Sequence, residues 1–297
     1  MKLHLAALFL VIFLKYLEFF PERKINILRS FGVPNNEDDD FFITHRDKCG
    51  GIIYDCGTYT LNNPEATQEA KDRITLEGYK EKALYVNELC DDIFSFDSDW
   101  SKDGFETNIY NQTYLEEAGL SPVLVIHNIF SDEVNYIIDS GCKMVAIGSQ
   151  EINHVDTLAP IVYKLRKAGV RVHLFGTTRY DLVAPLPIYS CDSSSWAKTG
   201  AFGNVNYWNP LKDNWNKTDT IYMEEYYHST DKKVNYFSEY EYREEFEEYL
   251  YNTFQLTHED LLGKYRHYNI HLVNTHYYME LERIINDEHR RRGILVE

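Results

Sequence analysis

Eight short, mostly apolar runs recur along this chain of 297 residues, and they constrain its fold more than any other feature. Runs of this length and composition are typical of parallel strands that are buried on both faces. Stretches with helical spacing lie between them, and eight strands alternating with helices predict an α/β fold, a (β/α)8 TIM barrel with a C-terminal helical extension. The runs are Leu3–Leu8, Ile25–Phe31, Gly51–Asp55, Ile93–Asp97, Pro122–His127, Lys143–Gly148, Arg171–Gly176 and Ile188–Asp192.

Four of these runs end in a side chain that can carry chemistry. Three end in the carboxylates of Asp55, Asp97 and Asp192, and one ends in His127. In a (β/α)8 barrel the active site lies at the carboxyl ends of the strands, so the four side chains should converge on one mouth. A pair of carboxylates at such a mouth can carry out chemistry at a glycosidic bond.

The chain length suits one barrel domain over residues 1–297, with a barrel core over about 1–210 and a helical closure over about 211–297. The apolar stretch Leu5–Leu14 is similar to the core of a signal peptide. However, Lys15 and Glu18 follow it at once, and no small-residue cleavage site appears. We therefore expect a first strand over Leu3–Leu8 and a helix over Val11–Phe20, with a signal peptide as the alternative.

Two segments, Ser131–Gly141 and Val155–Gly169, are amphipathic, and each ends at a glycine that suits a left-handed helix cap before the next strand. This order favours the α/β class. The remaining expectations are a helix over Thr67–Cys90, a loop over Asp99–Gln112, one helical turn over Leu115–Gly119, an acidic helix over Glu239–Tyr249, and two closing helices over Thr257–Tyr268 and Leu272–Arg292.

The chain has 47 acidic and 30 basic residues, which give a net charge of −17. This charge argues against general electrostatic binding of nucleic acid, although it permits one basic rim on an acidic protein. Lys198 and Arg179 are candidates for phosphate contacts, whereas the run His289–Arg292 is interpreted as a basic helix end. The five cysteines have no metal-ligand spacing and fit reduced thiols in a cytoplasm, so no metal or cofactor is expected.

The order of several segments resembles the tRNA-guanine transglycosylase family. Asp55–Thr60 resembles its Asp-Ser-Gly-Gly-aromatic-Gln segment, and Ser190–Ser193 falls where the family carries its nucleophile in Phe-Asp-Cys-Val. Four further segments resemble the base-reading strands and the C-terminal helix of the family: Val123–His127, Met144–Ser149, His173–Leu182 and Leu272–Tyr278. The similarity is thin in each segment, but it runs in order from about Gly51 to Met279.

Two departures from the family pattern narrow the resemblance. The stretch Tyr249–Phe254 has none of the cysteines that bind structural zinc in the family, and Asn274 falls near the expected histidine ligand. The chain is also shorter than typical members that act on tRNA. In both respects it is similar to the phage-type subgroup that inserts 7-deazaguanines into DNA, and the Ser-x-Asp-Ser-x-x-Trp pattern around Asp192 agrees with that subgroup.

The resemblance implies exchange of guanine in nucleic acid for a 7-deazaguanine base, with DNA favoured as the substrate and tRNA as the alternative. Asp192 would attack C1′ and form a covalent glycosyl intermediate, and Asp55 would move the protons. The resemblance implies a substrate-binding role for six further residues: Asp97 on the Watson–Crick edge of the base, Tyr59 and Phe175 on its two faces, and His127, Gly148 and Ser149 on its other edge. It also implies a cytoplasmic enzyme, the host cytoplasm if the protein is viral, with no membrane partner.

Several alternatives stay open. Tyr59 and Phe175 could be core aromatics, His127 could be a packing residue, and Asp99 competes with Asp97 for its role. The enzyme could be another barrel glycosidase or N-glycosyl hydrolase that uses two carboxylates. It could also be a catalytically inactive paralogue that only binds nucleic acid. The oligomeric state is open, with a homodimer as one alternative.

Overall fold

The computed structural model describes residues 1–33, 40–42, 44–101, 103–148, 154–223 and 235–296. Its strands are β1 (Lys2–Ala6), β2 (Ile25–Ser30), β3 (Cys49–Asp55), β4 (Asp92–Ile93), β5 (Leu124–Ile126), β6 (Met144–Ile147), β7 (Arg171–Leu174), β8 (Ser190–Ser193), β9 (Asn204–Trp208), β10 (Thr218–Tyr222) and β11 (Asn235–Tyr236). Its α-helices are α1 (Leu10–Phe19), α3 (Thr58–Asn62), α4 (Gln68–Asp72), α5 (Leu76–Val86), α6 (Phe105–Glu117), α7 (Glu133–Asp139), α8 (Val155–Lys167), α9 (Tyr180–Val183), α10 (Ser195–Ala201), α11 (Arg243–Phe254) and α12 (Arg266–Arg292). Short 3₁₀ turns are η1 (Arg46–Lys48), η2 (Asn87–Leu89), η3 (Phe237–Glu239) and η4 (His258–Leu261).

The described residues form two compact units. The first unit comprises residues 1–7, 24–193 and 285–297, and the second comprises residues 8–23 and 194–284. The first unit therefore holds β1–β8 with α3–α9 and the last turns of α12. The second unit holds α1, α10, α11, β9–β11 and most of α12.

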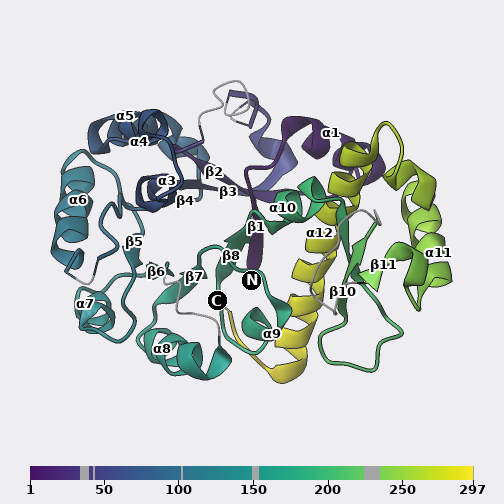
Figure 1. Cartoon of the computed structure of the whole chain (residues 1–297). Helices are drawn as coiled ribbons and strands as arrows, with labels where there is room; N and C mark the ends of the chain where they lie inside the picture. Colours follow the sequence, from purple (N-terminus) through teal and green to yellow (C-terminus); the bar gives the residue numbers. More distant parts are fainter. Residues whose placement is uncertain (34–39, 43, 102, 149–153, 224–234, 297) are drawn as a thin grey trace. The chain divides into compact units, whose positions relative to one another are not determined.

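The first unit is built on a curled, all-parallel sheet of eight strands in the order β4-β3-β2-β1-β8-β7-β6-β5, with helices α5 to α8 along its outside (Figure 1). These eight strands match the eight apolar runs of the sequence, so the α/β prediction is confirmed. Beyond the named strands, Phe94 forms a parallel bridge with Val123. The N–H of Ser95 donates to the carbonyl of Val123 at 2.9 Å, and the N–H of Val123 donates to the carbonyl of Ile93 at 2.7 Å.

Each face of the sheet has its own hydrophobic cluster, which explains why the strands read as continuous apolar runs. Ile53 belongs to one cluster and its neighbour Tyr54 to the other, because successive side chains of a strand point to opposite faces. One cluster joins β3 to the helices α5 and α6. The other joins side chains from several strands of the curled sheet: Leu28, Ile53, Phe94, Val123, Val125, Met144 and Ala146.

Glycines end the helices that precede β6 and β7, as the sequence predicts. Gly141 and Gly169 have φ angles of +72° and +80°, the left-handed conformation that glycine adopts without a steric penalty. Gly57 also has a positive φ, and a Cβ atom there would lie 2.3 Å from the backbone of Gly32. The tight turn after β3 therefore requires glycine at position 57.

Several helix predictions are wrong, and α6 is the most instructive. The segment Asp99–Gln112 was expected to be a loop because it has few aliphatic residues, yet α6 covers Phe105–Glu117 and absorbs the turn expected at Leu115–Gly119. The buried side of α6 is formed by Asn108, Asn111 and Leu115. The two asparagine amides donate to backbone carbonyls at 2.8 and 2.9 Å. Polar side chains therefore occupy buried positions that are apolar in an ordinary amphipathic helix.

Two other boundaries also differ from the expectation. The helix expected over Thr67–Cys90 is divided into α4, α5 and the turn η2, because Thr75 caps a new helix by accepting from the N–H of Gly78. Of the two closing helices, the first is only the turn η4, which Thr257 begins with a capping box. The second, α12, starts at Arg266 and is longer than expected.

The second unit has a small three-stranded sheet in the order β11-β10-β9, with β10 antiparallel to β9 and parallel to β11. The helix α11 covers Arg243–Phe254, close to the predicted acidic helix. The N-terminal apolar stretch is divided between β1, in the first unit, and α1, in the second. Among the described residues, no helix combines the length and the apolarity needed to cross a bilayer.

Candidate active site

The four chemistry-bearing residues lie at the carboxyl ends of strands in the first unit. Asp55 is the last residue of β3, His127 directly follows β5, and Asp192 is the third residue of β8. Asp97 lies four residues beyond the end of β4. Because the strands are parallel, their carboxyl ends form one edge of the sheet, and the four side chains belong to that edge.

Asp192 is buried and is held by groups from β7 and the turn that follows it. The N–H of Gly176 donates to Oδ1 of Asp192 at 3.1 Å, and Nε2 of His173 lies 3.3 Å from the same oxygen. The other ring nitrogen of His173 lies 2.9 Å from Oγ of Ser190. An ionised carboxylate only accepts, so Nε2 is the donor to Asp192. His173 thus connects two side chains of β8, Ser190 and Asp192.

A second histidine lies next to this group. His4, on β1, is paired in register with Asp192, and its ring centroid is 6.3 Å from that of His173. Burial, and then the neighbouring His173, lower the pKa of His4 well below the ordinary histidine value. His4 is therefore neutral at physiological pH, which avoids a second buried charge beside Asp192.

Asp97 is the centre of a separate hydrogen-bonded cluster. Oδ1 of Asp97 accepts from Oγ1 of Thr58 at 2.6 Å and from Sγ of Cys56 at 3.0 Å. Oδ2 accepts from Nε2 of His127 at 2.8 Å and from Nε1 of Trp100 at 3.2 Å. Both oxygens therefore already have donors from the protein, and a bound base would have to displace one of them.

Cys56 takes part in this cluster as a thiol. Burial, and then the charges of Asp97 and Asp55, raise the pKa of the Cys56 thiol well above its ordinary value. The proton stays on sulfur, so Cys56 donates to Asp97 and is no nucleophile.

The charges at the centres of both clusters, Asp97 and Asp192, act on Asp55. Its Oδ2 accepts from Oγ of Ser30 and from the N–H of Gly57, both at 3.0 Å. Burial first, then the negative charges of Asp97 and, to a lesser extent, Asp192, raise the pKa of Asp55 to about 7, against the effect of the two hydrogen bonds. A carboxyl group with this pKa can both give and take a proton near neutral pH.

The residues expected to bind a base are only partly brought together. A Cβ atom on Gly148 would lie 2.9 Å from Cε1 of His127, so these two residues are adjacent. Tyr59 is 59% exposed and its ring centroid lies 6.1 Å from that of Trp100. Phe175 packs instead on Phe94 and His173. Among the described ring contacts none joins Tyr59 to Phe175, and Ser149 lies outside the described residues.

The sequence alone assigns no role to two residues of the site, His173 and Trp100. His173 lies inside an apolar run, where a histidine is interpreted as a core residue. Only the register of the strands brings it close to Asp192. Trp100 follows Asp97 in a segment without helical periodicity. The nearest sequence signal is spacing: His173 precedes Phe175 by two residues and therefore shares its face of the strand.

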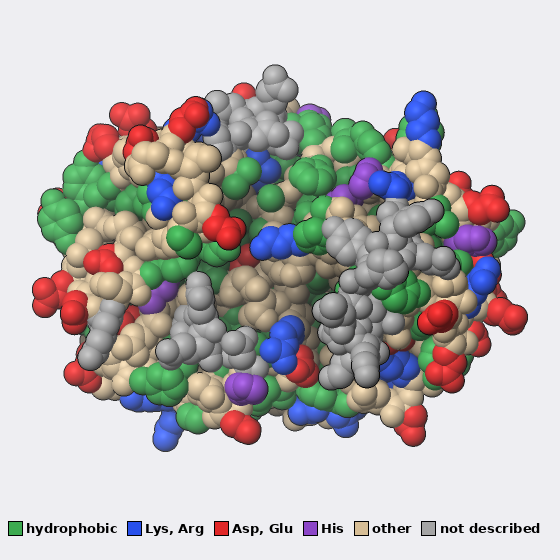
Figure 2. Space-filling view, in the orientation of Figure 1, with side chains coloured by type: hydrophobic (Ala, Val, Ile, Leu, Met, Phe, Trp, Pro, Cys, Tyr) green, Lys and Arg blue, Asp and Glu red, His purple; other side chains and the backbone are tan. Residues whose placement is uncertain are grey.

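The candidate phosphate contacts lie in different places. The guanidinium of Arg179 is paired with the carboxylate of Asp181 at 2.6 Å, so it is not a free cation, and Lys198 belongs to the second unit. In the run at the end of α12, His289 is buried, and Arg291 and Arg292 pair with Glu288. On the face drawn in Figure 2, acidic side chains gather over α4 and α5 and over α11.

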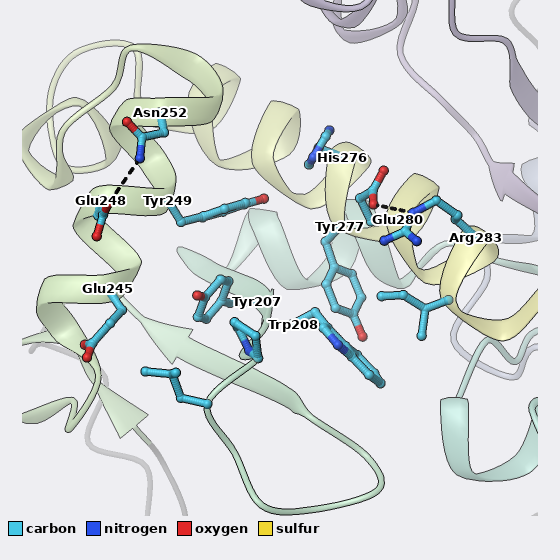
Figure 3. A pocket seen from close by; sticks show the side chains of 13 residues that line it. Tyr207, Trp208, Glu245, Glu248, Tyr249, Asn252, His276, Tyr277, Glu280 and Arg283 are labelled. Atoms are coloured by element: carbon cyan, nitrogen blue, oxygen red, sulfur yellow. Dashed lines mark hydrogen bonds and ion pairs between the residues drawn. The ribbon is translucent and has the colours of Figure 1, made fainter. Parts of the chain in front are cut away.

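The second unit has a pocket of about 500 Å³ between β9, α11 and α12. Tyr207 and Trp208 of β9, Tyr249 of α11 and Tyr277 of α12 line it (Figure 3). The described lining residues include none of the predicted site residues. The ring of Tyr249 lies 5.0 Å from that of Tyr207, so aromatic packing forms this side of the pocket.

Asn274 makes structural hydrogen bonds within the second unit. It is fully buried and accepts from the N–H of Asn206 at 2.8 Å. Its amide donates to the carbonyls of Asn204 at 3.0 Å and Trp196 at 3.4 Å. Over the described part of the chain, no three His, Cys, Asp or Glu side chains lie together in a way that could hold a metal ion.

Comparison with known proteins adds no relative: no family model, no curated protein and no solved structure matches the chain. The chemical capacity of the site therefore rests on its own geometry. It combines a carboxyl group that titrates near neutral pH, Asp55, with a carboxylate held by donors, Asp192. Both lie at one sheet edge. This pair could protonate a leaving group and attack an electrophilic carbon.

Proposed function

We propose that the curled sheet closes into a (β/α)8 barrel. The parallel bridge between Phe94 and Val123 supports closure, because Phe94 directly follows β4 and Val123 directly precedes β5, the two outer strands of the sheet order. The hydrophobic cluster that contains Leu28, Ile53, Val125 and Ala146 supports it as well, since side chains from β2, β3, β5 and β6 meet in one place. A closed barrel brings the carboxyl ends of all eight strands around one mouth.

We further propose that the protein is a base-exchange transglycosylase that replaces guanine in nucleic acid with a 7-deazaguanine, with DNA as the favoured substrate and tRNA as the alternative. The observation that carries this proposal is the pair Asp55 and Asp192 at one edge of the sheet: the pKa of Asp55 is raised to about 7, and Asp192 is held by hydrogen bonds from Gly176 and His173. A carboxyl group that can give a proton near neutral pH, together with a second carboxylate, is the arrangement that acid-assisted displacement at a glycosidic carbon requires. The choice of guanine as substrate comes from the resemblance in the sequence, and the pair of carboxyl groups agrees with it.

In the first half-reaction, an oxygen of Asp192 forms a bond to C1′ while the bond from C1′ to the guanine nitrogen breaks. The electron pair of that bond goes to the base, and Asp55 supplies the proton that neutralises it. In the second half-reaction, Asp55 takes the proton from the incoming 7-deazaguanine, whose nitrogen attacks C1′ and releases Asp192. Two displacements retain the configuration at C1′.

The alternative of a glycosidase or N-glycosyl hydrolase uses the same two carboxyl groups with water as the acceptor. One observation favours this alternative: both oxygens of Asp97 have donors from the protein, which leaves fewer acceptors for a base edge. The products separate the two functions. Exchange leaves a modified nucleoside in an intact strand, whereas hydrolysis leaves free guanine and an abasic site.

The test uses single-stranded DNA, duplex DNA and tRNA, each incubated with the protein and a 7-deazaguanine base. Mass spectrometry of the digested nucleosides identifies the products. The proposal predicts a 7-deazaguanine nucleoside in DNA, and in amounts that exceed those in tRNA. Free guanine with abasic sites would instead establish the hydrolase, and the absence of any change in all three substrates would contradict both.

A further inference from the structure

The pocket of the second unit is lined by aromatic rings from three elements. The rings of Tyr207 and Trp208 come from β9, that of Tyr249 from α11 and that of Tyr277 from α12 (Figure 3). Tyr207 and Tyr277 are buried, and the rings of Tyr207 and Tyr249 pack together with centroids 5.0 Å apart. The volume of about 500 Å³ lies in the range of sites that bind small molecules.

Two buried polar side chains of α12 that line the pocket have partners within the protein. The hydroxyl of Tyr277 lies 2.8 Å from Oγ1 of Thr218, and Nδ1 of His276 lies 3.4 Å from the hydroxyl of Tyr16. Burial lowers the pKa of His276 to about 4, so its imidazole is neutral at physiological pH. His276 therefore adds no positive charge that would repel a cation.

Carboxylates lie on two sides of the rings. Glu245 and Glu248 come from α11 and Glu280 from α12, and Figure 3 shows the rings between them. Glu280 is paired with Arg283 at 2.8 Å and with Arg23 at 3.0 Å. Among the described residues, neither Glu245 nor Glu248 is in an ion pair. The uncompensated charge that these side chains bring to the pocket is therefore negative.

This negative charge acts on the rings themselves. Burial, and then the charge of Glu245, raise the pKa of Tyr207 to about 12, and Glu248 adds to the effect. The hydroxyl of Tyr207 thus stays protonated and its ring stays neutral. The faces of neutral aromatic rings attract cations, and the net charge of −17 attracts cations to the protein over longer distances.

We propose that the pocket lined by Tyr207, Trp208, Tyr249 and Tyr277 binds a small organic cation with a quaternary ammonium group. Such a group has no N–H to donate, so it needs ring faces and nearby negative charge and no precisely placed acceptors. A primary ammonium ion is strongly hydrated and would lose its water without gaining acceptors in return. The described lining includes no residue of the candidate active site, so this binding site does not depend on the proposed function.

The test measures the binding of choline to the full chain by isothermal titration calorimetry. Its uncharged isostere dimethylbutanol, in which carbon replaces the nitrogen, should bind at least about tenfold more weakly. Putrescine, which has primary ammonium groups, should also bind at least about tenfold more weakly. Absence of choline binding, or equal affinity for choline and dimethylbutanol, would overturn the proposal, and tighter binding of putrescine would overturn the choice of a quaternary ammonium group.

A tryptophan pair tests the role of the rings, once circular dichroism has established that each variant is folded. Trp208→Leu should weaken choline binding at least about tenfold, whereas Trp208→Phe, which keeps a ring, should weaken it about threefold or less. Trp215→Leu is the matched control, because Trp215 also belongs to the second unit but is not among the described lining residues. Equal losses in Trp208→Leu and Trp215→Leu would contradict the proposal.

The two glutamates of α11 are tested separately, since both side chains are exposed and their substitution leaves the core intact. Glu245→Gln combined with Glu248→Gln should weaken choline binding about tenfold and leave dimethylbutanol binding unchanged. Glu244→Gln is the matched control for Glu245→Gln, because both glutamates lie in the first turn of α11 but only Glu245 lines the pocket. An unchanged affinity in the double variant, or an equal loss in Glu244→Gln and Glu245→Gln, would show that the pocket does not recognise charge.

Vesicles of phosphatidylcholine carry the same trimethylammonium group beside a phosphate. The carboxylates of the pocket repel that phosphate, so the protein should not sediment with the vesicles. Sedimentation that free choline prevents would overturn the choice of a free small molecule as the ligand.

Discussion

Nε2 of His173 lies 3.3 Å from Oδ1 of Asp192, and the imidazole is completely buried between neighbouring strands of the parallel sheet. The register of the sheet produces this relationship, because His173 pairs with Ser190 and Asp192 lies two residues further along the same face. One histidine therefore contacts both Ser190 and the candidate nucleophile. In the proposed mechanism it is a positioning residue, since it would act on the substrate only through Asp192.

His173→Leu should slow formation of the covalent intermediate by about ten- to a hundredfold, since Asp192 loses a donor in a buried site. Ser190→Ala should have a smaller effect, because Asp192 keeps its contact with His173. Single-turnover kinetics on guanine-containing nucleic acid measure both rates, with KM determined separately. If His173→Leu changes KM but leaves the single-turnover rate unchanged, the histidine is only a packing residue.

Asp55 should make both activity and stability depend on pH. Its pKa in the folded protein is about 7, above the ordinary value of 3.8, because burial and the neighbouring carboxylates oppose its charge. Asp55 therefore lowers the free energy of unfolding least below pH 4, and this destabilisation grows as the pH rises from about 4 to 7. The full difference corresponds to about 4 kcal/mol, but partial solvent access reduces the expected effect to about 1–2 kcal/mol.

Asp55→Asn removes this titration. The variant should be more stable than the unmodified protein at pH 8 and equally stable at pH 4, as urea unfolding at the two values would show. Base exchange by the unmodified protein should have an inflection near pH 7 that Asp55→Asn lacks. A stability difference that is the same at both pH values would contradict the raised pKa.

Asp97→Asn should destabilise the fold and loosen Trp100. The substitution replaces one acceptor oxygen by a donor that faces the donors Thr58, Cys56, His127 and Trp100. We expect a loss of about 1–3 kcal/mol in the free energy of unfolding and a shift in tryptophan emission. Thr58→Val, which removes a single donor, is the milder control. Unchanged stability and emission would show that the cluster does not depend on the carboxylate.

Asn274→Ala should be among the most destabilising changes in the second unit. It leaves the N–H of Asn206 and the carbonyl of Asn204 without their partner in a buried place, at a cost of about 2–4 kcal/mol. Asn252→Ala is the matched control, because Asn252 is exposed and makes one contact of 3.4 Å with Glu248. Urea unfolding compares the two.

The same hydrogen bonds predict that chelators leave the unfolding midpoint unchanged. Stoichiometric zinc in the purified protein, together with a lower midpoint after chelation, would contradict this account of the second unit.

The sequence predicted the sheet better than the helices, for a physical reason. Strands buried on both faces are nearly all apolar, so runs such as Lys143–Gly148 mark strands such as β6 directly. The helix α6 was missed because Asn108 and Asn111 form its buried side, and the start of α12 was missed because its first turn, Arg266–Asn269, has no buried side chain. Periodicity of apolar residues does not detect a buried polar stripe.

The candidate site was predictable to the same extent as the strands. A carboxylate or histidine at the end of a predicted strand is placed by topology alone, and Asp55 and His127 are examples. Contacts between loops and between neighbouring strands depend on register and side-chain direction, which a single sequence does not contain. The stacking of Trp100 on His127 and the bond from His173 to Asp192 belong to this second kind.

The most direct test of the central claim, that Asp192 is the nucleophile and Asp55 the proton carrier, is covalent trapping on a denaturing gel. The unmodified protein, Asp192→Asn and Asp55→Asn are each mixed with guanine-containing nucleic acid and a 7-deazaguanine. Circular dichroism first establishes that all three are folded. The account predicts an adduct with the unmodified protein, none with Asp192→Asn, and a residual adduct with little turnover for Asp55→Asn. An adduct with Asp192→Asn but none with Asp55→Asn would contradict the claim by reversing the two roles.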